Sequence, residues 1–196
     1  MPREHNTNND NLPELPQVAI ILAGKGSKSI GATEDSVAEQ SYKNVTVLQN
    51  TEESTPVFFN RLVKDCEIYG FMNTGDIFAS KNSLQDIVSK LSENKFIGGI
   101  YADSCIKESE VVREFYFPPH DPQTFPNLVG VFPVFFKLQV IQQEPLDENL
   151  EYLYGHNTLV KISQSSIVSH IPETLFTLAT KEVNIESDIN YLKNVS

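Results

Sequence analysis

Apolar runs that alternate with helical patterns between residues 18 and 102 constrain the fold more than any other feature of this sequence. Val18–Ala23 is apolar throughout and ends at a glycine, which is typical of a strand buried on both faces of a parallel sheet. Further strands are predicted at residues 45–48, 68–72 and 96–102. The alternation predicts a single α/β domain with a mostly parallel central sheet flanked by helices.

Helices are predicted in the intervals between these strands. Residues 29–42 carry apolar side chains at helical spacing, and residues 58–63 suit a short helix or a turn. The most regular pattern covers residues 83–91, where Ser83 and Asp86 predict a capping box at the first turn.

Beyond residue 110 the pattern changes. Residues 115–117 and 128–136 predict mixed or antiparallel strands, so the C-terminal part of the sheet should be mixed. The aromatic side chains between residues 125 and 136 are interpreted mainly as core, namely those of Phe132, Phe135 and Phe136. The loop Pro118–Pro126 is long and rich in proline, and such loops often form the wall of a binding site.

The chain length of 196 residues favours one domain with a sizeable core. Residues 1–16 are polar and rich in asparagine, and they are interpreted as an N-terminal tail. The folded unit is predicted over residues 17–185, and residues 186–196 are interpreted as a C-terminal tail.

Charge and composition exclude several classes of protein. A net charge of −11 and a pI near 4.8 disfavour nucleic acid as a partner, because phosphate binding needs clustered Lys and Arg. The sequence contains neither a run long enough to span a bilayer nor a signal peptide. We therefore expect a cytoplasmic protein or a component of a particle such as a virion. Cys66 and Cys105 have no metal-site spacing and are interpreted as buried free thiols.

A glycine-lysine loop follows the first strand in the stretch "IILAGKGSKSIG". Gly24, Lys25, Gly26 and Lys28 stand between a buried strand and a helix, an arrangement suited to phosphate because the helix start offers free N–H groups. The alternative is a plain strand-to-helix turn. A dinucleotide site is excluded, because Gly24, Gly26 and Gly31 have the wrong spacing.

Four segments in order resemble family 2 glycosyltransferases of the GT-A fold, within the nucleotide-diphospho-sugar transferases. They are "SVAEQSYKNVTVL" at 36–48, the stretch 71–103 around the DXD motif, the stretch 134–163 around the catalytic base, and the final strand at 165–181. The opening loop also resembles that of sugar nucleotidyltransferases and cytidylyltransferases. The resemblance implies a nucleotide-sugar site that contains the loop residues together with Glu52 and Asn73, and Mn²⁺ or Mg²⁺ if the site is active.

The motifs that carry the chemistry of this family are altered here. Glu52 stands in Thr51-Glu52-Glu53-Ser54 where the family reads Asp-Asp-Gly-Ser, and Asn73-Thr74-Gly75-Asp76 replaces Asp-x-Asp-Asp. His156 and Asn157 follow Gly155 where the family has Glu-Asp. The segment 48–68 is also shorter than in the family by about one helix and one strand. We interpret Asp76 as a turn cap and His156 as an ordinary buried or solvent-facing histidine.

These departures predict a glycosyltransferase-like domain that has lost catalysis, with Asp76, His156 and Asn157 as remnants and with no metal. Such a domain would serve as a binding or structural subunit, with protein partners and with a nucleotide or sugar as a further ligand. One alternative is an active transferase that uses Glu52, Asp76, Asp103 or His156 in unusual roles, with Lys25 and Lys28 replacing the charge of the metal. A sugar nucleotidyltransferase is the second alternative.

Overall fold

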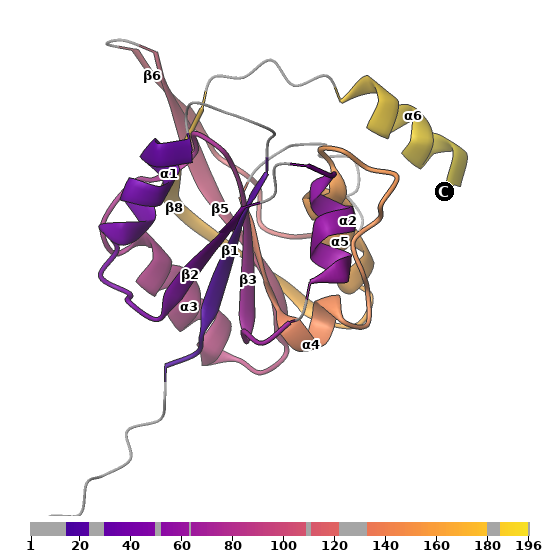
Figure 1. Ribbon diagram of the computed structural model, residues 1–196, viewed down its shortest axis with the longest axis horizontal. Helices are drawn as coiled ribbons and strands as arrows, with labels where there is room; N and C mark the ends of the chain where they lie inside the picture. Colours follow the sequence, from indigo (N-terminus) through magenta and orange to yellow (C-terminus); the bar gives the residue numbers. More distant parts are fainter. Residues whose placement is uncertain are drawn as a thin grey trace, which may run out of the picture.

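A computed structural model describes residues 15–23, 30–49, 52–62, 64–108, 111–121, 133–179 and 185–195. The strands are β1 (Val18–Ala23), β2 (Val45–Gln49), β3 (Ile68–Asn73), β4 (Ile77–Phe78), β5 (Ile97–Glu108), β6 (Val111–Phe115), β7 (Val134–Lys137) and β8 (Ile167–Leu178). The helices are α1 (Ile30–Ala38), α2 (Thr55–Arg61), α3 (Ser83–Glu93), α4 (Leu138–Ile141), α5 (Tyr154–Ile162) and α6 (Glu186–Val195). Figure 1 shows one sheet with helices on both sides.

The sheet has the strand order β2-β1-β3-β7-β5-β8-β4, and β6 pairs with β5 outside this path. Strand β1 runs parallel to β2 and β3, and β5 runs parallel to β8. Because β3 and β5 are both antiparallel to β7, the strands β1, β2, β3, β5 and β8 all point the same way. The predicted mostly parallel sheet is therefore confirmed, and the antiparallel β4, β6 and β7 make it mixed.

Strand β1 lies at the centre of the core, and all six of its residues are buried. Val18, Ile20 and Leu22 belong to an apolar cluster that includes side chains of α1 and α3. The alternate residues of β1 belong to a second cluster with Phe59 of α2 and with side chains of α4 and α5. The prediction that β1 is buried on both faces is thus confirmed, because helices cover each face of the sheet (Figure 1).

Two of the predicted helices begin or end at other residues. Helix α1 ends at Ala38 rather than at residue 42, and α2 covers Thr55–Arg61 rather than residues 58–63. A proline in the first turn of α2 favours this earlier start, because proline lacks the N–H that the first turn leaves unused.

The capping box predicted for α3 is wrong. Asn82 is the N-cap residue and makes no side-chain cap hydrogen bond. The Ser83 hydroxyl instead accepts a hydrogen bond from the Ser80 N–H at 3.1 Å, so it stabilises the turn before the helix. Asp86 is exposed in the first turn, where its charge suits the helix dipole.

The C-terminal segment 186–196, predicted to be a tail, contains helix α6. Tyr191 and Leu192 of this helix pack partly buried against the core cluster, and Asp188 is buried. Among the described helices, none is both long and apolar enough to cross a membrane.

The prediction of buried free thiols is confirmed for Cys66 and Cys105. Burial, and then the neighbouring charge of Asp65, raise the pKa of the Cys66 thiol to about 11. We expect neither cysteine to react with iodoacetamide at about pH 8 in the folded protein, because only the thiolate attacks and both thiols are covered. Mass spectrometry of the alkylated protein, with and without urea, checks this. Rapid labelling of Cys66 without denaturant would contradict the prediction.

Candidate functional site

The candidate site lies where β1 and β3 end. Helix α1 follows β1 on one face of the sheet, and α2 leads into β3 on the other face. In open α/β sheets, ligands bind beyond the carboxyl ends of the strands at the topological switch point, where helices of neighbouring strands lie on opposite faces of the sheet. Ala23 and Asn73 are paired at this edge, and the Thr74 N–H donates to the Ala23 carbonyl at 2.8 Å.

A tight turn, Asn73–Asp76, closes the end of β3. Gly75 has φ 99°, a left-handed conformation that favours glycine, and its N–H donates to the buried Thr33 hydroxyl at 2.8 Å. The Asp76 N–H donates to the Asn73 carbonyl at 3.0 Å. The turn is therefore fixed against α1, and a side chain at position 75 would be strained.

Both carboxylate oxygens of Asp76 accept hydrogen bonds from the backbone. Oδ2 accepts from the Asn73 N–H at 3.0 Å, and Oδ1 accepts from the Ala179 N–H at 2.9 Å. The residue is 2% exposed. Asp76 thus joins the turn after β3 to the residue that follows β8, and this geometry supports its interpretation as a cap.

The residues of this turn do not fit a divalent cation. A hard cation such as Mg²⁺ or Mn²⁺ needs several oxygen ligands, usually with carboxylates among them. Asp76 directs its oxygens at two N–H groups, and Gly75 has no side chain. Among the described residues, no three His, Cys, Asp or Glu side chains gather in a way that could hold a metal.

The start of α5 lies at the same edge of the sheet. The ring of Tyr154 stands 5.8 Å from that of Phe71 on β3, measured between centroids. Gly155 packs against Val134, the partner of Phe71 in the sheet, and a Cβ on Gly155 would lie 2.8 Å from Val134 Cγ2. Burial raises the pKa of Tyr154, a hydrogen bond with Thr55 partly offsets this, and the charge of Asp76 raises it again.

The remnant residues of α5 are covered. His156 is 4% exposed, and Asn157 is partly buried, with its backbone N–H bound to the Leu153 carbonyl at 2.9 Å. A general base must reach the proton that it removes, so a histidine this deeply buried is poorly placed for that role. The structure therefore favours the interpretation of His156 as a buried histidine.

The other predicted site residues lie in different surroundings. Asn73 is partly buried beside Ala23, whereas Glu52 is exposed in the bend before α2. Gly24, Lys25, Gly26 and Lys28 lie outside the described residues, as do Phe125 and Phe132. The structure thus brings Asn73 and Asp76 together with the start of α5.

Sequence reasoning missed a buried pair between β5 and β8. His170 Nε2 lies 2.8 Å from Asp103 Oδ1, and both side chains are less than a tenth exposed. Asp103 Oδ1 also accepts the Phe117 N–H at 2.8 Å, and the Tyr101 hydroxyl donates to the Pro118 carbonyl at 2.7 Å. These bonds hold the start of the proline-rich loop on the sheet. The only sequence signal for Asp103 and His170 is that each is a polar residue within a mainly apolar strand. No periodicity predicts that the two residues pair.

Comparison with known proteins shows which fold this is. No protein-family model matches the sequence, and no curated protein matches it. The structure of S. aureus TarS 1–349 superposes with a TM-score of 0.65 at 13% identity, covering 91% of this chain and 64% of that one. The mannosyltransferase PcManGT from Pyrobaculum calidifontis, in complex with GDP-Man and Mn²⁺, gives 0.59 at 16% identity, with 86% and 58% covered.

This is the GT-A glycosyltransferase fold. The predicted GT-A architecture is therefore confirmed. TarS 1–349 in complex with UDP-GlcNAc matches with a TM-score of 0.64 at 12% identity, over 86% of this chain and 60% of that one. The chain spans about three fifths of the length of these glycosyltransferases. At such identities the likeness shows the fold alone.

Proposed function

We propose that this chain is a GT-A domain that no longer carries out metal-dependent sugar transfer and serves as a binding or structural subunit. The observation that carries the proposal is the hydrogen bonding of Asp76, the only carboxylate of the turn after β3. Both of its oxygens accept backbone hydrogen bonds. In a metal-dependent transferase, carboxylates at this place would hold the cation that neutralises the departing diphosphate.

The fold supports a nucleotide or a nucleotide sugar as the small ligand. PcManGT was solved with GDP-Man and Mn²⁺, and TarS with UDP-GlcNAc. In this chain the corresponding binding would use the edge at Asn73 and the glycine-lysine loop, where Lys25 and Lys28 would add positive charge for the phosphates.

Calorimetric titration with GDP-mannose and UDP-GlcNAc, each with Mn²⁺ and with EDTA, tests the proposal. We expect any affinity to be the same in both buffers, because the turn offers the cation too few oxygens. The control is Asn73→Asp, which adds a carboxylate at the first position of the turn. A dissociation constant below about a millimolar only with Mn²⁺ would overturn the proposal.

An active transferase with atypical residues is the second candidate. It is favoured by the convergence of Asn73, Asp76 and the start of α5 at one edge of the sheet. Release of UDP or GDP from a nucleotide sugar, lost in the His156→Ala variant, would support it. A sugar nucleotidyltransferase instead predicts binding of CTP or UTP, and weaker binding in the Lys28→Ala variant.

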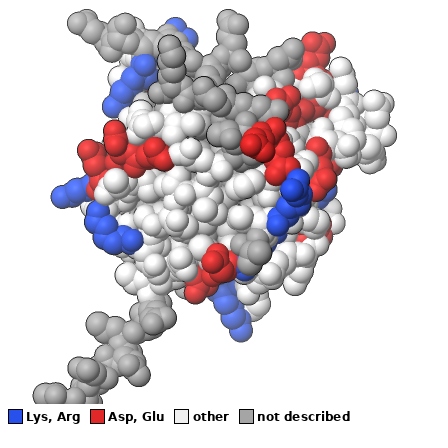
Figure 2. Space-filling view, viewed as in Figure 1, with Lys and Arg blue, Asp and Glu red and all other residues white. Residues whose placement is uncertain are grey.

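The surface supports a protein partner. Strand β6 is fully exposed, and its apolar side chains Val111, Val112 and Phe115 are between 40% and 55% exposed. Among the described strands it pairs with β5 alone. The face shown in Figure 2 carries groups of both acidic and basic side chains, with areas of other residues between them. An exposed apolar strand of this kind is a common contact surface for other proteins.

Mass photometry of native extracts checks the assembly part of the proposal, including a particle such as a virion as its setting. We expect the chain in a complex of fixed stoichiometry, and we expect the Val112→Lys variant to weaken this association. A free monomer in the extract would contradict the proposal.

A further inference from the structure

Helix α6 attaches to the domain mainly through polar groups. Asp188 is its one buried residue, whereas α3 buries five residues, four of which are apolar. Tyr191 and Leu192 add only partly buried contact with the core. Elements with few buried apolar contacts open at low free-energy cost, so α6 belongs to the readily opened part of the fold.

Asp188 occupies the start of α5. Its Oδ2 accepts the N–H groups of Tyr152 and Leu153, both at 2.8 Å, and each carboxylate oxygen lies 3.2 Å from the Glu151 N–H. Leu153 is the N-cap residue of α5. A carboxylate is favoured at this end of a helix, because the first N–H groups lack partners within the helix and carry partial positive charge.

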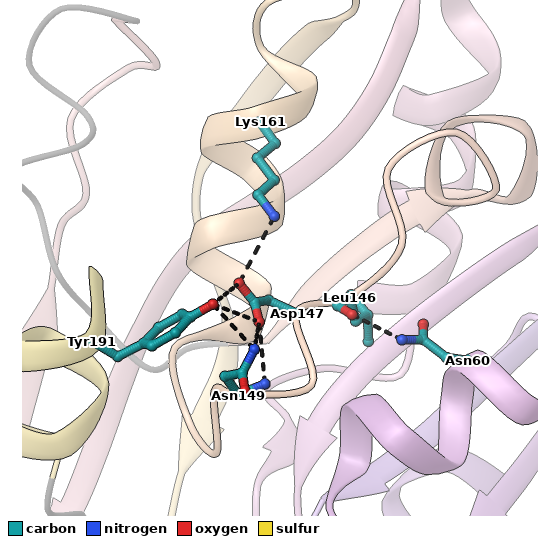
Figure 3. Close-up of polar contacts among 6 residues, drawn as sticks. All are labelled: Asn60, Leu146, Asp147, Asn149, Lys161 and Tyr191. Atoms are coloured by element: carbon teal, nitrogen blue, oxygen red, sulfur yellow. Dashed lines mark hydrogen bonds and ion pairs between the residues drawn. The ribbon is translucent and has the colours of Figure 1, made fainter. Parts of the chain in front are cut away.

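A second polar contact lies one turn further along α6 (Figure 3). The Tyr191 hydroxyl donates to Asp147 Oδ2 at 3.2 Å and accepts a hydrogen bond from Asn149 Nδ2 at 3.1 Å. Asn149 Nδ2 also donates to Asp147 Oδ1 at 3.0 Å, and Lys161 Nζ lies 4.0 Å from Asp147 Oδ2. Figure 3 shows α6, the loop after α4 and α5 meeting at Asp147.

These contacts lie next to the candidate site. Asp188 accepts a hydrogen bond from the Leu153 N–H, and Tyr154 is the next residue. The ring of Tyr154 packs on Phe71, and the charge of Asp76 contributes to the raised pKa of its phenol. Anything that holds or releases residues 151–153 therefore acts on the start of α5, where His156 also lies.

We propose that α6 is a releasable strap over the start of α5, with Asp188 as its latch. In the closed state the strap holds residues 151–153 and limits access to the candidate site from the side of α5. In the open state these three N–H groups are exposed to water. The consequence for ligand binding depends on the proposed function, whereas the opening itself does not.

Amide hydrogen exchange of the full chain tests the strap, with Asp188→Ala as the variant. We expect residues 151–153 to exchange at least about tenfold faster, with unchanged exchange in β1, because the latch is lost while the core remains. Tyr191→Phe, which keeps the ring, should give a smaller increase at the same amides. Ser187→Ala is the matched control, since it changes an exposed side chain in the first turn of the same helix.

Two results would overturn the strap. Unchanged exchange at residues 151–153 would mean that Asp188 is not the latch, and equal acceleration in β1 would make α6 part of the cooperative core. Titration with UDP separates this proposal from the proposed function. If both the native chain and Asp188→Ala bind UDP, the variant should bind more tightly, because loss of the latch raises the population of the open state. Equal affinity would contradict the strap. If neither chain binds, the nucleotide ligand is contradicted and exchange alone decides the strap.

Discussion

Replacement of Asp76 by alanine is expected to lower the free energy of unfolding by roughly 2–5 kcal/mol, because two backbone N–H groups lose their buried acceptor. These are the N–H groups of Asn73 and Ala179, which lie 106 residues apart in the chain and both donate to this carboxylate. Since domains are stable by about 5–15 kcal/mol, the loss is a large part of the total. Urea denaturation followed by circular dichroism measures it.

The size of the effect separates a structural carboxylate from a ligand-binding one. Asp76→Asn keeps one acceptor oxygen and should cost less than Asp76→Ala. Asp35→Ala removes an exposed aspartate from α1 and should change stability by less than about 0.5 kcal/mol. If Asp76→Ala unfolds like the native chain but loses Mn²⁺-dependent nucleotide binding, Asp76 is a metal ligand and the proposed function is wrong.

The elements that sequence reasoning predicted well are those with a strong local pattern. The apolar run of β1 and the helical spacing in α3 each depend on burial of particular side chains, and burial leaves a periodic mark in the sequence. The ends of α1 and α2 were less accurate, because a helix end depends on one or two residues and on tertiary contacts.

The candidate site was predictable only in part. Its location followed from the resemblance of the turn Asn73–Asp76 to the DXD motif, and the structure places this turn beside Ala23 at the edge of the sheet. The partners of Asp76 and of Asp188 are backbone N–H groups far away in the chain, and backbone groups carry no residue identity. No pattern of side chains can therefore predict these two contacts.

The pairing of β7 with β3, which are far apart in the sequence, determines which residue fits at position 70. Sequence reasoning predicted mixed strands after residue 110 but not the insertion of β7 between β3 and β5. The insertion places Phe135 opposite Gly70. A Cβ at position 70 would lie 2.7 Å from Cδ1 and Cζ of the Phe135 ring and closer still to Cε1. Glycine at position 70 thus makes room for an aromatic ring that comes from 65 residues further along the chain.

Gly70→Ala is therefore expected to destabilise the domain by about 3 kcal/mol or more, because overpacking a filled core forces side chains out of their rotamers. The ring of Phe135 has little freedom to move: it is 1% exposed and stacks on Phe176 with centroids 6.1 Å apart. Thermal unfolding by calorimetry measures the loss. Gly31→Ala is the control, since no heavy atom lies within 4 Å of its added Cβ and alanine suits a helix better than glycine.

The double variant Gly70→Ala, Phe135→Leu decides whether the clash is the cause. Leucine removes the ring that the new methyl group meets, so the second substitution should restore part of the stability lost in Gly70→Ala, although Phe135→Leu alone is destabilising. Two residues in contact should deviate from additivity by about 1–3 kcal/mol. Strictly additive losses would mean that β3 and β7 do not pack at this position, and the placement of β7 beside β3 would then be wrong.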